Sequence, residues 1–248
     1  MSPKFCWVVA LHAEAAPIID AFELKMSSNE LLFPVYINPD NGHCLVVSGV
    51  GAVRSASAAT FLKVQLSVGK YAAWINIGVA GYFEDKLGSV YQAIKVMGQS
   101  SGDTFSPGLR FSGIFKSATL ITVSRPEKKF SEQALYDMEA SGFCSICPRF
   151  SCNELTYVIK IVSDTPNLSY KLLTRKSVTK LIENQISVII EFSYQLSNIV
   201  ESERIRLDCP SEVSEFESTF KFSKTRKLMF RNAYRKWKAI FPDKALKV

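Results

Sequence analysis

The chain has 248 residues, enough for one large α/β domain or two small ones. Its hydrophobic content of 47% and charged content of 21% are ordinary for a globular protein and exclude wholesale disorder and collagen-like repeats. The net charge of +7 is unevenly distributed, because residues 221–248 hold ten Lys/Arg and one acidic residue. The rest of the chain carries 20 basic and 22 acidic groups. The charge pattern therefore indicates a near-neutral body with a basic tail.

No apolar run reaches the roughly 18 residues that a membrane-spanning helix needs. The N-terminus lacks a signal-peptide core because His12 and Glu14 interrupt its apolar stretch, so we expect a cytoplasmic protein. The cysteines are too scattered for a disulfide scaffold. Cys144, Cys147 and Cys152 are interpreted as buried apolar thiols, with a metal or redox site as the alternative. We expect no metal and no organic cofactor.

The first 165 residues alternate apolar runs of strand length with stretches of helical spacing. Strands are predicted at 4–10, 44–47, 72–77, 90–96, 119–123, 134–138 and 157–162, and helices at 14–24, 53–67, 139–149, 172–196 and 221–241. The segment 98–113 is rich in Gly, Ser and Pro and is predicted as a loop. This order predicts an α/β fold with a central mixed, mostly parallel sheet flanked by helices. We expect an α/β domain over 1–220 and a basic, aromatic helical extension over 221–248.

Ligands of such sheets bind beyond the carboxyl ends of the strands. Three acidic residues, Glu14, Glu139 and Asp164, each follow a different predicted strand. Glycine-rich segments at 48–51 and 78–81 are predicted turns whose backbone N–H groups can approach a ligand closely. Each feature alone has an ordinary structural explanation as a helix start, a cap or a tight turn. Their combination predicts one acidic pocket.

Five motifs appear in order, each at the end of a predicted strand. They are Val8-Val9-Ala10-Leu11-His12-Ala13-Glu14, Ser48-Gly49-Val50-Gly51, Ile75-Asn76-Ile77-Gly78-Val79-Ala80-Gly81, Asp137-Met138-Glu139-Ala140 and Val162-Ser163-Asp164. From about residue 5 to 168, this series resembles the nucleoside phosphorylase/nucleosidase superfamily, most of all the bacterial methylthioadenosine/S-adenosylhomocysteine nucleosidases. The resemblance implies the three-layer phosphorylase/hydrolase-like fold, a homodimer and hydrolysis of an N-glycosidic bond in a purine-nucleoside-like substrate.

The resemblance also implies roles for individual residues. Asp164 would protonate the departing base, and Glu14 would activate the attacking water. Glu139 would accept hydrogen bonds from the ribose hydroxyls and favour a cationic sugar ring, while Met138 packs beneath that ring. The remaining predicted substrate-binding residues are Gly51, Gly78, Val79, Ala80, Gly81, Arg125, Phe130 and Ser163.

Several departures from the family pattern leave alternatives open. Val79 stands where the nucleosidases carry Ser, and in the short segment 124–130 either Phe130 or Arg125 would face the base. In the phosphorylases an Arg lies just ahead of the corresponding glycine and holds phosphate. This chain has no Arg just ahead of Gly78, which favours hydrolysis over phosphorolysis, although Arg54 is a candidate phosphate ligand. The alternatives are a phosphate-dependent phosphorylase and a nucleoside-binding protein without turnover.

The basic tail has its own pattern. Phe230, Tyr234, Trp237 and Phe241 recur at helical spacing and predict a helix docked by its aromatic face, with Lys and Arg in water. Interleaved cations and aromatic residues also fit an anionic partner, either a nucleic acid, a membrane surface or an acidic protein. A nucleic-acid-associated function is therefore a further alternative.

Overall fold

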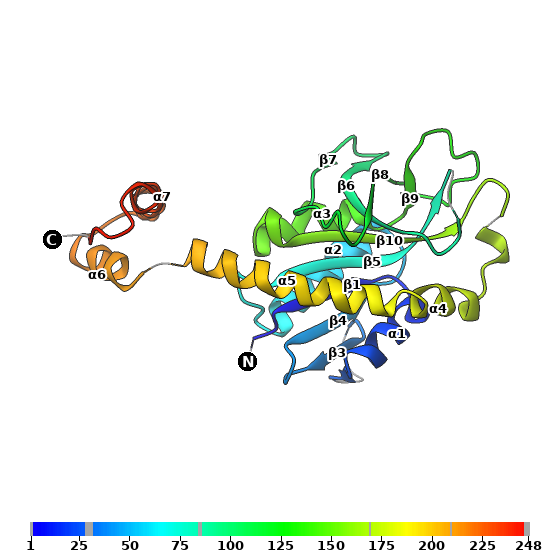
Figure 1. Cartoon of the computed structure of the whole chain (residues 1–248), viewed down its shortest axis with the longest axis horizontal. Helices are drawn as coiled ribbons and strands as arrows, with labels where there is room; N and C mark the ends of the chain where they lie inside the picture. Colours follow the sequence, from blue (N-terminus) through cyan, green and yellow to red (C-terminus); the bar gives the residue numbers. More distant parts are fainter. Residues whose placement is uncertain (1, 28–31, 84–85, 169, 209, 246–248) are drawn as a thin grey trace. The chain divides into compact units, whose positions relative to one another are not determined.

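The computed structural model describes residues 2–27, 32–83, 86–168, 170–208 and 210–245. The chain divides into two compact units, Met1–Glu201 and Ser202–Val248. The expected division at residue 220 stays a prediction. Helices and strands carry the labels of Figure 1.

A mixed ten-stranded sheet forms the centre of the first unit in the described part of the chain. Its strands are β1 (Phe5–Val9), β2 (Lys25–Met26), β3 (Val35–Asn38), β4 (His43–Val47), β5 (Ala73–Tyr82), β6 (Val90–Gly98), β7 (Thr104–Phe105), β8 (Lys116–Thr122), β9 (Leu135–Asp137) and β10 (Thr156–Asp164). Parallel pairings join β1 to β4 and β5, and β5 to β10. β2 and β3 extend the sheet beyond β4 as an antiparallel edge.

One half of the sheet closes into a ring. β10 pairs with β6, β6 with β8, β8 with β9, and β9 returns to the far end of β5. β5 therefore has three neighbouring strands, with β1 and β10 beside it and β9 at Gly81 and Tyr82. The ring brings the carboxyl ends of β5, β9 and β10 together.

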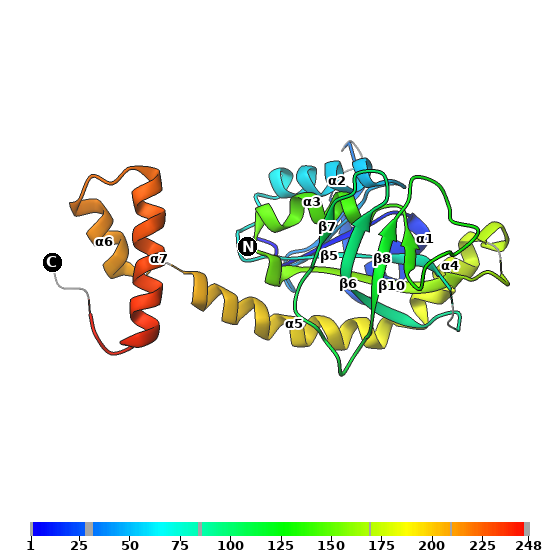
Figure 2. The ribbon, with the colours of Figure 1, turned by 90° about the horizontal axis from the view of Figure 1, so that it is seen from above.

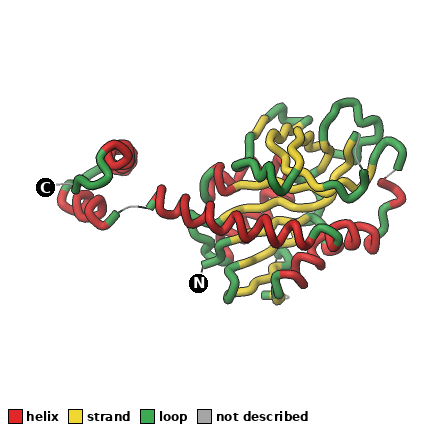
Figure 3. Tube along the Cα trace, in the orientation of Figure 1, coloured by secondary structure: helices red, strands yellow, loops and turns green. Residues whose placement is uncertain are grey.

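Helices cover both faces of the sheet, as Figures 2 and 3 show. They are α1 (His12–Ala21), α2 (Ala52–Gln65), α3 (Ala140–Phe150), α4 (Arg175–Glu183) and α5 (Ile186–Leu207). Successive strand residues point to opposite faces, so β1 supplies two cores. Cys6 and Val8 pack with residues of α2 and α3, whereas Trp7 and Val9 pack with residues of α1, α4 and α5. Burial on both sides explains why β1 is apolar throughout, and the predicted three-layer α/β fold is confirmed.

Four features differ from the sequence predictions. The segment 78–81 is not a turn but continues β5 to Tyr82. The helix predicted over 172–196 is two helices, α4 and α5, which are separated at residues 184 and 185. Strands β2 and β3 were not predicted, and β7 lies inside the predicted loop 98–113. Short edge strands carry too few residues for a clear alternation of apolar and polar side chains.

The predicted turn at 48–51 is present, with Gly49 at φ 78° and Gly51 at φ 115°. These are left-handed backbone conformations that glycine adopts without strain. Cys144 and Cys147 on α3 are buried in the core, and Cys152 is half-buried. No helix in the described ranges is long and apolar enough to cross a membrane.

Helices α2 and α3 approach each other at Gly142. A Cβ atom at this position would lie 1.9 Å from the carbonyl oxygen of Ala52. We expect Gly142→Ala to lower the free energy of unfolding by about 1–3 kcal/mol, because the two helices must move apart. Gly113→Ala is the matched control, since its Cβ would meet no atom within 4 Å. Chemical denaturation of both variants measures the difference, and equal stability would contradict this account of the helix contact.

Candidate active site

A cavity of about 160 Å³ lies at the carboxyl ends of β1, β5, β9 and β10. The three predicted acidic residues, Glu14, Glu139 and Asp164, all line it. So do Met138, Val79, Ala80, Gly81, Phe130 and Ser163 from the predicted set. The wall also includes residues that were not among the predicted site residues, namely Ala10, Leu11, Val50, Val123, Pro126, Glu127, Tyr136, Asp137, Tyr170 and Leu173.

Glu14 is held in the first turn of α1 by backbone donors. Its Oε2 accepts from the N–H of Leu11 at 2.9 Å, and its Oε1 accepts from the N–H of Val79 at 2.8 Å. A Cβ on Gly78 would lie 2.7 Å from Oε1, so only glycine lets the carboxyl group approach β5 this closely. Burial raises the pKa of Glu14, and the hydrogen bonds together with the charge of Lys160 only partly oppose this effect.

Glu139 lies at the junction of β9 and α3. Its Oε1 accepts from the N–H of Gly51 at 2.9 Å, so the turn after β4 fixes a carboxyl group that follows β9. Burial and then the negative charge of Asp137 raise the pKa of Glu139 to about 7. The charge of Lys160 acts in the opposite direction.

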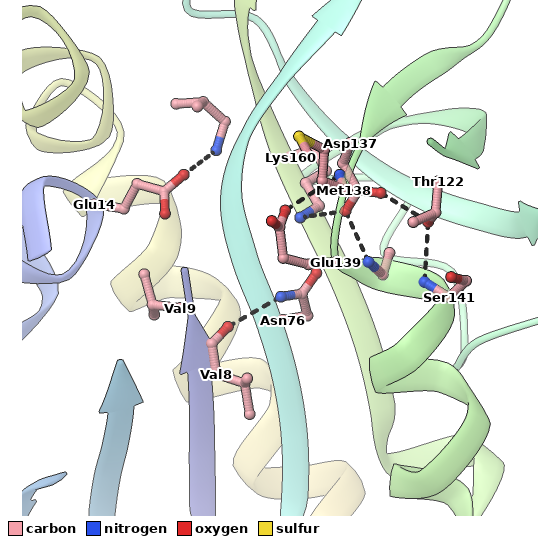
Figure 4. A network of polar contacts seen from close by, with 12 residues as sticks. Val8, Val9, Glu14, Asn76, Thr122, Asp137, Met138, Glu139, Ser141 and Lys160 are labelled. Carbon is pink, nitrogen blue, oxygen red and sulfur yellow. Dashed lines mark hydrogen bonds and ion pairs between the residues drawn. The ribbon is translucent and has the colours of Figure 1, made fainter. Parts of the chain in front are cut away.

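Beside Glu139 lies a buried ion pair. The Nζ of Lys160 lies 2.9 Å from the Oδ2 of Asp137, and both side chains are almost fully buried. Asp137 also accepts from the hydroxyl of Thr122 at 2.8 Å and from the N–H of Ala140 at 2.9 Å, and it thereby caps the N-terminus of α3 (Figure 4). Burial lowers the pKa of Lys160, but the charges of Asp137 and Glu139 outweigh burial and raise it above its ordinary value. Lys160 therefore stays a cation.

The sequence motifs predicted no role for Lys160 or Asp137. The available signal was the lysine itself, which interrupts an otherwise apolar run in a strand that is buried on both faces. A buried lysine needs an acidic partner. The partner could not be chosen from the sequence, since several acidic residues follow other strands.

Asp164 ends β10 and lines the cavity. Its Oδ1 accepts from the hydroxyl of Ser163 at 2.6 Å. Burial raises the pKa of Asp164, while the hydrogen bond from Ser163 acts in the opposite direction. A Cβ on Gly81 would lie 2.9 Å from the Oδ2 of Asp164 and 2.6 Å from the ring of Phe130. Glycine at this point of β5 leaves room for both side chains.

Four other predicted residues do not line the cavity. Gly51 and Gly78 do not line the cavity; Gly51 donates to Glu139, and Gly78 makes room for Glu14. Arg125 is exposed to solvent and does not line the cavity, where its neighbours Pro126 and Glu127 do. Arg54 is also exposed and lines adjoining surface hollows instead.

The ring-closed mixed sheet with helices on both faces is the fold of the nucleoside phosphorylase/nucleosidase superfamily. The chain is similar to 5'-methylthioadenosine nucleosidase from Arabidopsis thaliana, with a TM-score of 0.62, 16% identity and coverage of 80% of this chain and 96% of that chain. It is also similar to 5'-methylthioadenosine/S-adenosylhomocysteine nucleosidase from Helicobacter pylori with butyl-thio-DADMe-Immucillin-A (TM-score 0.65, 13% identity, 79% and 99% coverage).

Futalosine hydrolase from the same bacterium is a third similar structure, with a TM-score of 0.64, 14% identity and coverage of 79% of this chain and 99% of that chain. No family model and no curated protein matches the sequence. The resemblance drawn from the motifs is thus confirmed as a shared fold.

The buried ion pair generates a prediction about stability. Asp137→Asn keeps the side-chain shape but leaves Lys160 without its nearest counter-charge. We expect the free energy of unfolding to fall by about 3 kcal/mol, as for other buried pairs that lose one partner. The double variant Asp137→Asn with Lys160→Met removes both charges and should recover most of the loss. Denaturant unfolding of all three proteins checks this, and an unchanged midpoint in the single variant would refute it.

Proposed function

We propose that this protein hydrolyses the N-glycosidic bond of a purine-nucleoside-like substrate. The observation that carries the proposal is the gathering of Glu14, Glu139 and Asp164 around one cavity that Met138 also lines. Breaking this bond develops positive charge on the sugar and negative charge on the base. An acid for the base, an anion near the sugar and a base for water are therefore the groups that the reaction needs.

Asp164 acts as the acid in this proposal. Its raised pKa favours the protonated form, which donates to a nitrogen of the departing base. Phe130 lies beside it, with its ring against Gly81, and offers an apolar surface on which the base stacks.

Glu139 and Met138 face the sugar. The carboxylate of Glu139 accepts hydrogen bonds from the ribose hydroxyls, and its charge stabilises the cationic ring in the transition state. Lys160 pairs with Asp137 and fixes the position of that neighbouring side chain. Met138 supplies an apolar floor beneath the ring.

Glu14 acts on the water. Each of its carboxylate oxygens accepts one backbone hydrogen bond and keeps lone-pair capacity for a further donor. Its raised pKa makes it a stronger base than an exposed glutamate. Water is favoured over phosphate as the attacking group because no Arg lies just ahead of Gly78 to hold phosphate. The residue two positions before Gly78 is Asn76, which is buried and donates to the carbonyl of Val8. The homodimer that the resemblance implies stays a prediction.

Base release tests the proposal directly. Methylthioadenosine, S-adenosylhomocysteine, adenosine and inosine are offered with and without phosphate, and we expect release from one of them without phosphate. Glu14→Gln and Asp164→Asn should each lower kcat about 10²–10⁴-fold, the range for removal of a general acid or base. Glu183→Gln and Asp40→Asn are matched controls on the surface. Equal background release by the wild type and both site variants would exclude hydrolysis.

The raised pKa values predict a bell-shaped pH profile of kcat/KM. Activity falls as the pH drops through about 7, because Glu139, whose pKa is raised to about 7, then gains a proton and loses its charge. In this proposal Asp164 must carry the proton that the base receives, so activity is also lost when Asp164, whose pKa burial raises, ionises. Ser163→Ala removes the hydrogen bond that holds the pKa of Asp164 down, so the alkaline limb should move to higher pH while the acid limb stays in place. An unmoved alkaline limb would assign that limb to another group.

A further inference from the structure

The second unit is a pair of helices joined by aromatic stacking. α6 (Ser211–Thr219) and α7 (Lys224–Ile240) are linked through Phe216, whose ring centroid lies 4.9 Å from that of Phe230. Phe222, in the connection between the helices, stacks on Phe230 at 5.6 Å. The predicted aromatic face of the basic helix is thus the face that packs inside this unit.

Acidic residues of α6 neutralise cations on that same face. Arg231 donates to Glu217 twice, from Nε to Oε1 and from Nη2 to Oε2, each at 2.7 Å. Glu212 accepts a hydrogen bond from Tyr234 and lies 3.7 Å from the Nζ of Lys238. The packed face of α7 is therefore internally satisfied in both its apolar and its charged groups.

The opposite face of α7 has no such partner among the described residues. Leu228, Met229 and Ile240 are 60%, 67% and 69% exposed. Lys236 lies among them, while Lys224 and Arg226 lie at the two edges of this face, and all three are exposed and without an ion pair in the described ranges. The sequence of α7 contains no acidic residue at all. This face, defined by these six side chains, is called the cationic aliphatic face.

Helical spacing places the two kinds of side chain side by side. Met229, Lys236 and Ile240 follow one another at +7 and +4 and share one line along the helix, whereas Leu228 lies about 100° around the helix from Met229, on the line of Lys224. Exposed aliphatic side chains and cations are therefore neighbours on this surface. A partner that covers this surface must therefore offer both negative charge and apolar contacts.

We propose that the cationic aliphatic face binds the surface of an anionic phospholipid bilayer. Acidic headgroups complement the three cations, and the boundary of the acyl chains accepts the three aliphatic side chains. A nucleic acid would neutralise the cations but would leave Leu228, Met229 and Ile240 in water, because phosphates and base edges give aliphatic side chains little to contact. The binding is peripheral, since α7 is amphipathic, with one face already packed on α6.

Vesicle sedimentation with the full chain tests this proposal. Vesicles are made of phosphatidylcholine alone, or of phosphatidylcholine mixed with phosphatidylserine. We expect binding to the mixed vesicles only, and weaker binding as salt is added. The charge variant K224Q/R226Q/K236Q and the aliphatic variant L228S/M229S/I240S should each bind at least about tenfold more weakly, because each removes one of the two contributions.

The matched control is K25Q/K70Q/K176Q, which removes three exposed lysines from the first unit and should bind as the wild type does. Far-UV circular dichroism verifies that the variants keep their helices. Equal binding to both kinds of vesicle would overturn the proposal. Full binding by the aliphatic variant would also overturn it, because that result would indicate non-specific adsorption through charge. A third contrary result would be that duplex DNA or RNA displaces the protein from mixed vesicles and binds the aliphatic variant as well as the wild type.

Discussion

The structure depends on the position of β5, which pairs with three strands at once. Its first half lies between β1 and β10, and its last residues pair with β9. A strand in this position is covered on every side, so most of its side chains are apolar or small, and the buried amide of Asn76 donates to the carbonyl of Val8. Gly78 and Gly81 satisfy this constraint at the two points where acidic side chains approach β5, and the backbone N–H of Val79 is left to bind Glu14. The strand pairings that close the ring thus also bring the acidic groups together.

Acidic groups that lie close together repel one another, and one buried cation offsets part of this repulsion. Lys160 pairs directly with Asp137, and its charge opposes the rise in the pKa of Glu139 and of Glu14. A single cation does not fully neutralise several carboxyl groups, so burial still raises the pKa values of Glu14 and Glu139. Carboxyl groups with raised pKa values that share one cavity are the arrangement that the proposed acid and base chemistry requires.

Much of the fold followed from local patterns. Long apolar runs separated by helical stretches predicted the central strands, α1, α2 and α3, because burial on both faces requires continuous apolar residues. β2, β3 and β7 were missed because two to four residues of an edge strand carry no readable pattern. The segment 78–81 was predicted as a turn because glycine is frequent in turns, but here glycine serves close approach within a strand. The division of 172–196 into α4 and α5 has no glycine or proline to mark it.

The sequence by itself determined which residue types follow which strands, and this was sufficient to predict one acidic pocket at the strand ends. It also determined that the excess positive charge lies in residues 221–248, outside the motifs that predict the pocket. Only the tertiary structure decided that Lys160 meets Asp137, that Gly51 holds Glu139, and that Arg125 is exposed outside the cavity. The physical reason is that these contacts join residues from different strands, and their distances depend on how the ring of strands closes rather than on any local preference of the chain.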